Sequence, residues 1–201
     1  AEEQRRVEAA VRAIVAAVDL PVSVDTYRAT VAEAGLAAGA VLINDVTGFH
    51  ADPAMAPLVA RSGVPAVVMH NQRGRQFHDV IADIRAGLDE SIAIATAAGV
   101  PREHLIIDPG FGFGWSVAHN LEMLRRLGEL RSFGLPLLAG TSRKSTIGAV
   151  LDLPADERIW GTAATVAIAI ANGADIVRVH DVAAMVQVAR MTDAIVRPAT
   201  A

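Results

Sequence analysis

The chain has 201 residues, no cysteine, and 18 basic against 22 acidic side chains, which gives a net charge of −4. The absence of cysteine excludes disulfides, thiolate metal sites and reactive-thiol chemistry, and the charge gives no reason to expect nucleic acid or a membrane surface as a partner. The composition is 52% hydrophobic, yet no apolar run is long enough to span a membrane. We expect a single domain over residues 1–201 in the cytoplasm, with a charged helix rather than a signal peptide at Ala1–Val11.

Short apolar runs alternate with helical segments along the chain. In order, we expect a helix at 2–18, a strand at 21–24, a helix at 26–38, a strand at 41–43, a helix at 53–61, a strand at 65–69 and a helix at 78–98. Strands at 105–107, 136–139 and 175–179 follow, each before a helix, at 117–133, 158–171 and 182–196. Thr26 is expected to cap its helix, and breaks such as Gly39 and Pro101 separate the segments.

Six strands that each precede a helix, with no hairpin signal between them, predict a parallel sheet with right-handed crossovers. A polar side chain stands at or just after the end of every strand: Asp25, Asn44, His70, Asp108, Lys144 and Arg178 with His180. In a doubly wound sheet only the strands near the switch point contribute to the site, so this pattern favours a closed barrel. The predicted fold class is α/β, a (β/α)8 barrel of TIM type with about six of its eight units in this chain and its first two strands absent.

The stretch from Leu105 to Gly114, LIIDPGFGFG, has the clearest functional pattern. A buried strand ends in Asp108, and a proline and three glycines then forbid regular structure. Such a loop aims one carboxylate into a pocket while the backbone approaches a flat ligand. The alternative is that Asp108 only caps a turn.

Asp25 and Asn44 extend this pattern to two other strand ends. Carboxylates and an amide can pair with the adjacent N–H and amino donors of a heterocycle. The alternative is a local role, in which Asp25 with Thr26 caps a helix and Asn44 with Asp45 forms a turn or a cap.

Two basic segments follow the last two strands. Gly140–Ser145, GTSRKS, places two cations and three hydroxyls on one loop, and Arg178–Asp181, RVHD, follows the last strand. Loops at this place in a barrel often hold phosphate, and cationic donors stabilise a departing diphosphate. The alternative is a solvated basic loop, which suffices to explain Arg143. Surface or supporting positions suit the other histidines considered, which are His70, His78, His104 and His119. His70 and His180 do not form a metal site by themselves, because such a site needs further ligands.

Four segments, in this order and spacing, resemble the dihydropteroate synthases: Ser23–Gly48, Asp108–Gly114, Gly140–Ser145 and Arg178–Val182. The resemblance covers essentially the whole chain, and the SRKS and RVHD pair is specific. It implies a (β/α)8 barrel of folate biosynthesis that joins 6-hydroxymethyl-7,8-dihydropterin diphosphate to p-aminobenzoate and releases diphosphate. It also implies a dissociative mechanism, in which diphosphate leaves first and the aromatic amine attacks a bound pterin cation.

The resemblance implies a role for each matched residue. The pterin ring would be held by Asp25, Asn44 and Asp108, with Lys144 at its far edge. The diphosphate would be bound by Arg178 and His180, and the p-aminobenzoate pocket would be bordered by Phe113, Ser142 and Lys144. Lys144, Arg178 and His180 are thus the expected catalytic residues.

This sequence departs from the family in two respects. The family's first strand, with an Asn that helps to bind Mg²⁺ and diphosphate, has no counterpart here, nor has its second loop, which ends in a Thr-Arg-Pro-Gly motif. The resemblance implies Mg²⁺ as the cofactor, and because the Asn that helps to bind it lies in the missing segment, we expect no metal ligand in this chain. For the same reason, turnover by this chain alone is not expected. Trp115 stands where members often carry a basic residue.

Other readings of the sequence stay open. The family is usually a homodimer, and the apolar stripe of residues 182–196 suits either a dimer contact or core packing. A pterin-binding methyltransferase of the methyltetrahydrofolate type and a non-catalytic pterin-binding chain are the alternative functions. The methyltransferase has no evident need for the SRKS loop together with Arg178 and His180, and the non-catalytic chain would bind the pterin ring without forming product.

Overall fold

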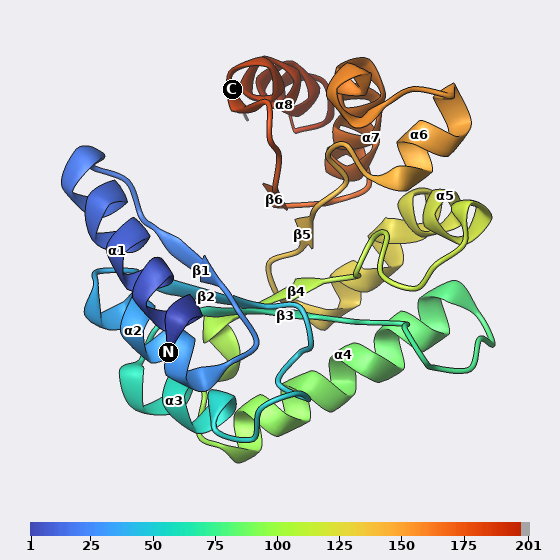
Figure 1. Cartoon of the computed structure of the whole chain (residues 1–201). Helices are drawn as coiled ribbons and strands as arrows, with labels where there is room; N and C mark the ends of the chain where they lie inside the picture. Colours follow the sequence, from blue (N-terminus) through green and yellow to red (C-terminus); the bar gives the residue numbers. More distant parts are fainter. Residues whose placement is uncertain (198–201) are drawn as a thin grey trace. The chain divides into compact units, whose positions relative to one another are not determined.

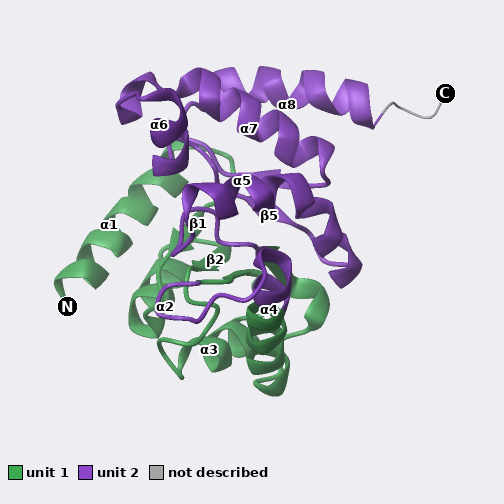
Figure 2. Ribbon diagram, turned by 90° about the vertical axis from the view of Figure 1, so that its right-hand side faces the viewer, with its two compact units in different colours: residues 1–71, 86–107 green, residues 72–85, 108–201 purple. Residues whose placement is uncertain are grey.

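The computed structural model describes residues 1–197, and residues 198–201 of the expected domain lie outside the described residues (Figure 1). The chain divides into two compact units (Figure 2). Unit 1 comprises residues 1–71 and 86–107, and unit 2 comprises residues 72–85 and 108–201. The expectation of a single domain stays a prediction.

Unit 1 contains most of a four-stranded sheet. Its strands lie in the order β1 (Ser23–Asp25), β2 (Leu42–Asp45), β3 (Ala66–Met69) and β4 (Leu105–Asp108). The β1–β2 and β2–β3 pairs are parallel. The helices before and between the strands are α1 (Glu2–Ala17), α2 (Ala29–Ala37), α3 (Met55–Ser62) and α4 (Val80–Ala97), followed by the short 3₁₀ helix η1 (Arg102–His104). Every residue of β3 is buried, as expected for a short run of β-branched and apolar residues covered on both faces.

Unit 2 is mostly helical. Its elements are α5 (Val117–Arg126), η2 (Leu127–Phe133), β5 (Leu138–Ala139), α6 (Ser145–Leu151), η3 (Ala155–Glu157), α7 (Ile159–Ala171), β6 (Ile176–Val177) and α8 (Val182–Val196). β5 and β6 pair in parallel, with Ala139 opposite Val177. α7 and α8 lie side by side (Figure 1), and Val166, Ile170 and Met185 form the buried cluster between them.

The six predicted strands and their alternation with helices are confirmed, whereas residues 1–197 form two sheets of four and two strands rather than one closed barrel. The helix predicted at 117–133 ends at Arg126 and continues as the 3₁₀ helix η2. The prediction missed α6, a short helix directly after the basic loop.

The predicted capping role of Thr26 is wrong. α2 begins at Ala29, and the Thr26 hydroxyl accepts a hydrogen bond from the Arg28 backbone N–H instead. The first N–H of the helix, at Ala29, donates to the Asp52 carboxylate at 2.8 Å. Because Asp52 is 23 residues away, the cap is tertiary and the local sequence does not contain it.

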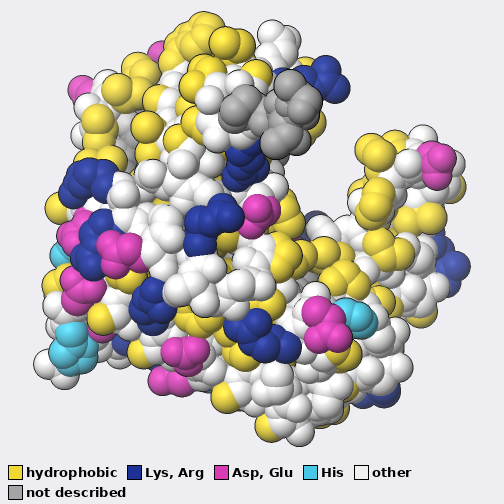
Figure 3. Space-filling model, turned by 180° about the vertical axis from the view of Figure 1, so that it is seen from behind, with side chains coloured by type: hydrophobic (Ala, Val, Ile, Leu, Met, Phe, Trp, Pro, Cys, Tyr) yellow, Lys and Arg dark blue, Asp and Glu magenta, His cyan; other side chains and the backbone are white. Residues whose placement is uncertain are grey.

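Acidic and basic side chains lie interspersed on the face that Figure 3 shows, in agreement with the small net charge. None of the helices within residues 1–197 is both long enough and apolar enough to cross a membrane.

Candidate active site

The ends of β1 and β2 bring two predicted site residues together. Asp25 pairs with Asn44 in the strand register, and the Asn44 side-chain N–H donates to the Asp25 carboxylate at 3.0 Å. Asn44 is 8% exposed, so this bond fixes the orientation of an amide that has little freedom to turn. The site role expected for both residues stays a prediction.

Asp45, next to Asn44, has the local role that was the alternative for this pair. One carboxylate oxygen accepts hydrogen bonds from the backbone N–H and hydroxyl of Thr47, both at 2.7 Å, and the other accepts from the Phe49 N–H. Burial raises the pKa of Asp45, and these hydrogen bonds oppose the rise. Asp45 therefore holds the turn after β2.

His70 follows β3 and is 2% exposed, so of its two predicted positions it takes the supporting one rather than the surface. Its imidazole packs against α4 at Gly87, where an added Cβ would lie 2.0 Å from Nδ1. His78 has the opposite environment, since its side chain is 67% exposed and contacts Asp83.

Asp108 ends β4 and opens the glycine loop of unit 2. It is 9% exposed, and its Oδ1 accepts a hydrogen bond from the Gly110 N–H at 2.8 Å, so the predicted turn cap is present. The three glycines at 110, 112 and 114 have φ between +78° and +84°, the left-handed region that residues with a Cβ rarely adopt. The glycines are therefore required by the path of the loop.

Asn120 supports this loop and was missed by sequence reasoning. It is 2% exposed on α5, its Oδ1 accepts from the Gly112 N–H at 2.7 Å, and its Nδ2 donates to the Ser116 carbonyl. The signal was available, because a polar residue on the face of α5 that also buries Met123 and Leu124 requires a partner.

Lys144 converges on the same loop. Its Nζ donates to the Phe111 carbonyl oxygen at 3.0 Å and lies 4.2 Å from the centre of the Phe113 ring. The Arg73 guanidinium lies 5.1 Å from the same ring centre. Three predicted site residues, Asp108, Phe113 and Lys144, thus belong to one connected group, in which Phe113 is held by cations.

Trp115, at a position where members of the resembled family often carry a basic residue, packs against other aromatic side chains. It is 9% exposed and meets Phe77 and His119 edge to face, while Phe77 stacks on His119 with 4.1 Å between ring centres. The cluster joins the segment after β3 to the start of α5.

The two basic segments are joined directly. The Ser142 hydroxyl lies 3.2 Å from the His180 backbone N, which donates to it, and 3.0 Å from His180 Nδ1. Arg143 is not part of a solvated loop, because it forms a two-point ion pair with Asp181 that lowers the pKa of that carboxyl. Arg178 is exposed directly after β6, and its backbone N–H donates to Ala139.

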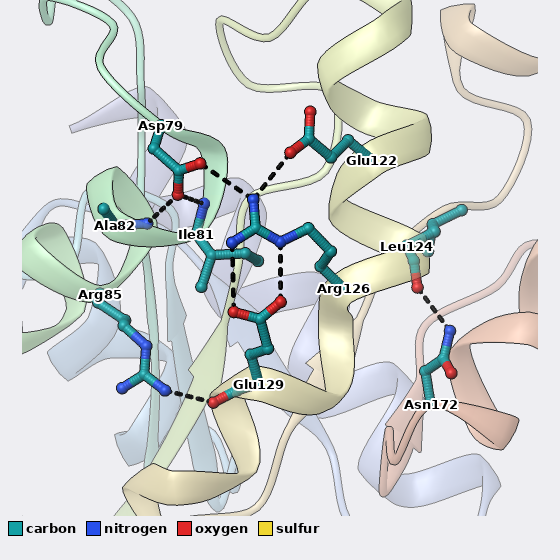
Figure 4. A network of polar contacts seen from close by, with 9 residues as sticks. All are labelled: Asp79, Ile81, Ala82, Arg85, Glu122, Leu124, Arg126, Glu129 and Asn172. Atoms are coloured by element: carbon teal, nitrogen blue, oxygen red, sulfur yellow. Dashed lines mark hydrogen bonds and ion pairs between the residues drawn. The ribbon is translucent and has the colours of Figure 1, made fainter.

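A second polar network lies outside these loops (Figure 4). Arg126, at the end of α5, donates to Asp79, Glu122 and Glu129, and Arg85 donates to the Glu129 carbonyl. Hydrogen bonds from Ala82 and Arg126 lower the pKa of Asp79. The network fixes the segment at 79–85 to α5 and η2 and is a structural feature of unit 2.

The part of the chain that the structure describes contains no group of three or more His, Cys, Asp or Glu side chains that could hold a metal ion. The sequence predicts Mg²⁺ as the cofactor, with no ligand for it in this chain. Both parts of that expectation stay predictions.

Proteins similar to this chain are known both by sequence and by structure. Residues 1–180 match the family of pterin-binding enzymes. The chain is 48% identical to the dihydropteroate synthase of Clostridium beijerinckii over 98% of this chain and 73% of that protein.

Two solved structures are similar in fold as well. The dihydropteroate synthase of Clostridium difficile, determined in the presence of pteroic acid, has a TM-score of 0.93 and 44% identity, over 96% of this chain and 74% of that chain. The Xanthomonas albilineans enzyme with 4-aminobenzoic acid has a TM-score of 0.92 and 41% identity, over 96% and 71%. The fold class is therefore that of these barrel enzymes, with six βα units present.

Proposed function

Since this chain belongs to the dihydropteroate synthase family and is a transferase of folate biosynthesis, we propose that the residues described above bind its two substrates. The substrates are 6-hydroxymethyl-7,8-dihydropterin diphosphate and p-aminobenzoate, and the products are dihydropteroate and diphosphate. The observation that carries this assignment is the convergence of Lys144 on Phe111 and Phe113 in the loop that follows Asp108.

The pterin ring is assigned to Asp108, Asn44, Asp25 and Lys144. A carboxylate can accept two parallel N–H donors from one edge of the ring, which is the strongest pairing for such a heterocycle. Burial of Asp108 and Asn44, at 9% and 8% exposure, limits competition from water. Asp25 supports this role by fixing the Asn44 amide.

The diphosphate is assigned to Arg178 and His180. Both follow β6 and are exposed, as residues that meet a soluble anion must be. The bond between the His180 backbone and Ser142 holds this loop against the SRKS loop. Cationic donors favour the departing diphosphate, since negative charge increases on it as the carbon–oxygen bond breaks.

The p-aminobenzoate pocket is assigned to Phe113, Ser142 and Lys144. The Xanthomonas albilineans relative holds 4-aminobenzoic acid, which supports an aromatic-amine site in this family. The Phe113 ring offers a flat apolar face, and Lys144 lies over that ring. Ser142 is 4% exposed and its hydroxyl contacts His180, so it also helps to hold the loop in the conformation that borders the pocket.

The reaction then needs no nucleophilic side chain. The bond between the pterin methylene carbon and the diphosphate oxygen breaks, and both electrons leave with diphosphate. The nitrogen lone pair of p-aminobenzoate forms the new bond to the resulting cation, and the nitrogen loses a proton. Lys144, Arg178 and His180 orient the reactants and stabilise the leaving group.

Three further assignments rest on the family resemblance. Mg²⁺ is proposed as a cofactor, and no step above passes through it. A homodimer is proposed, supported by large exposed apolar side chains on α6–α8, among them Val150, Trp160, Met191 and Ile195. Apolar atoms gather at the top of Figure 3, over helices of unit 2. A cytoplasmic location is proposed because charged pterin diphosphates do not cross membranes unaided.

Calorimetric binding of a pterin, with and without inorganic diphosphate, tests the assignment on the full chain and on Asp108→Asn. We expect binding that tightens with diphosphate and weakens about 10- to 100-fold in Asp108→Asn. Asp89→Asn, on the exposed side of α4, is the control and should bind as the unaltered chain does. Equal binding by Asp108→Asn contradicts the pterin assignment, and binding indifferent to diphosphate favours the methyltransferase alternative.

A further inference from the structure

The loops that follow β5 and β6 are joined by one ion pair. Arg143 donates to the Asp181 carboxylate through Nε at 3.0 Å and Nη2 at 2.5 Å, a two-point contact that fixes direction as well as distance. The two side chains are 34% and 21% exposed, and ion pairs this accessible to water contribute little to folding. Stability alone therefore does not explain the pair.

Both partners depart from a local preference in making this contact. Asp181 occupies the N-cap position of α8, where an aspartate ordinarily accepts from the first N–H groups of its own helix, yet it makes no capping hydrogen bond. Arg143 has a φ of +57°, in the left-handed region that a residue with a Cβ enters at a cost. Strain of this kind persists where the surrounding structure and a function require it.

The residues beside the pair are those assigned to the substrates. Ser142 and Lys144 flank Arg143, and His180 precedes Asp181. The backbone around Arg143 is held from the other side as well, since its N–H donates to Thr162 and its carbonyl accepts from Arg158. A fixed Arg143–Asp181 contact therefore fixes the backbone from which the Lys144 and His180 side chains project.

We propose that Arg143 and Asp181 are positioning residues, which hold His180 in the arrangement that binds diphosphate and fix the backbone next to Lys144. This inference rests on the proposed function. Loss of positioning and loss of charge change the affinity for diphosphate in opposite directions when the Asp181 anion is neutralised. Removing the negative charge alone strengthens anion binding, whereas losing the positioning contact weakens it. Arg143→Lys keeps the charge and loses the planar two-point contact.

Binding of inorganic diphosphate to the full chain, measured by calorimetry at fixed ionic strength, tests the proposal. Asp181→Asn and Arg143→Lys are each expected to bind about tenfold more weakly or worse than the unaltered chain. Asp193→Asn, which breaks the Arg197–Asp193 pair of α8, is the matched control and leaves binding unchanged. Equal or tighter binding by Asp181→Asn, or unchanged binding by Arg143→Lys, overturns the proposal.

Hydrogen exchange at the His180 amide separates this inference from the proposed function. That N–H donates to Ser142, so its exchange should become about tenfold faster or more in Asp181→Asn and stay unchanged in Asp193→Asn. If the unaltered chain binds no diphosphate, the proposed function fails and the exchange rate alone decides the inference. Faster exchange then supports positioning of the loop by the pair, and unchanged exchange overturns it.

Discussion

Gly112 is the residue of the glycine loop that faces the Lys144 side chain, and Gly112→Ala would disturb both the loop and the lysine. Its φ of +83° lies where alanine costs about 1–2 kcal/mol. A Cβ at this position would lie 3.1 Å from the Cδ of Lys144, closer than ordinary contact. The Cδ of Lys144 must then shift by a few tenths of an ångström, and we expect this shift to weaken the hydrogen bond from Nζ to the Phe111 carbonyl oxygen, at a cost of about 1 kcal/mol at a half-buried position screened by water.

Gly134→Ala is the matched control for the backbone cost. Gly134 also has a positive φ, +64°, and no atom lies within 4 Å of the position of an added Cβ. Urea unfolding should therefore show a loss of about 2–3 kcal/mol for Gly112→Ala and about 1–2 kcal/mol for Gly134→Ala.

The displacement of Lys144 is also expected to weaken binding of a pterin in the presence of diphosphate by about fivefold, the equivalent of 1 kcal/mol. Gly134→Ala should bind normally. Unchanged binding by Gly112→Ala, with a stability loss no larger than that of Gly134→Ala, would refute the conclusion that the loop constrains Lys144.

Two further predictions concern unit 1. Gly87→Ala places a methyl group 2.0 Å from His70 Nδ1, and this overpacking should lower the free energy of unfolding by about 1–3 kcal/mol; an unchanged urea midpoint would show that the imidazole moves aside. Asp52→Ala removes the acceptor for the Ala29 and Ala54 N–H groups and should cost about 1 kcal/mol at pH 7. These hydrogen bonds lower the folded-state pKa of Asp52 below its ordinary 3.8, so its stabilisation is present above that value and is lost as the pH falls through the folded pKa. Unfolding measured from pH 7 to pH 2 should show the difference between Asp52→Ala and the unaltered chain shrink in acid, and a constant difference would contradict the assignment.

The strands and their polar ends were predictable because the signals are local and repeated. Runs such as Ala66–Met69 are short, apolar and β-branched, and glycine or proline bounds each of them. In a parallel pair, consecutive strands end at the same edge, so Asp25 and Asn44 could be expected to meet. The motif resemblance then identified the residues that follow β4, β5 and β6.

The helix boundaries were less predictable, because distant partners determine them. The sequence around Thr26 offers a good cap, but Asp52 supplies the acceptor from another loop. The apolar pattern of residues 117–133 continues past Arg126, although the α-helix does not. There the Arg126 side chain binds three carboxylates, and Gly128 weakens the helical preference that would otherwise carry through.

Arg143 and Asp181 show why the site itself was only partly predictable. The sequence suggests a solvated loop at Arg143, and an aspartate at an N-cap position, such as Asp181, ordinarily caps its own helix. Both expectations fail through a single contact between residues 38 positions apart, which no local window of sequence includes. Side chains that position a binding loop are directed at one another rather than at their own backbone, so local rules fail together at such a place. The failure of both local rules at the ends of β5 and β6 thus indicates that the two loops form one structural element.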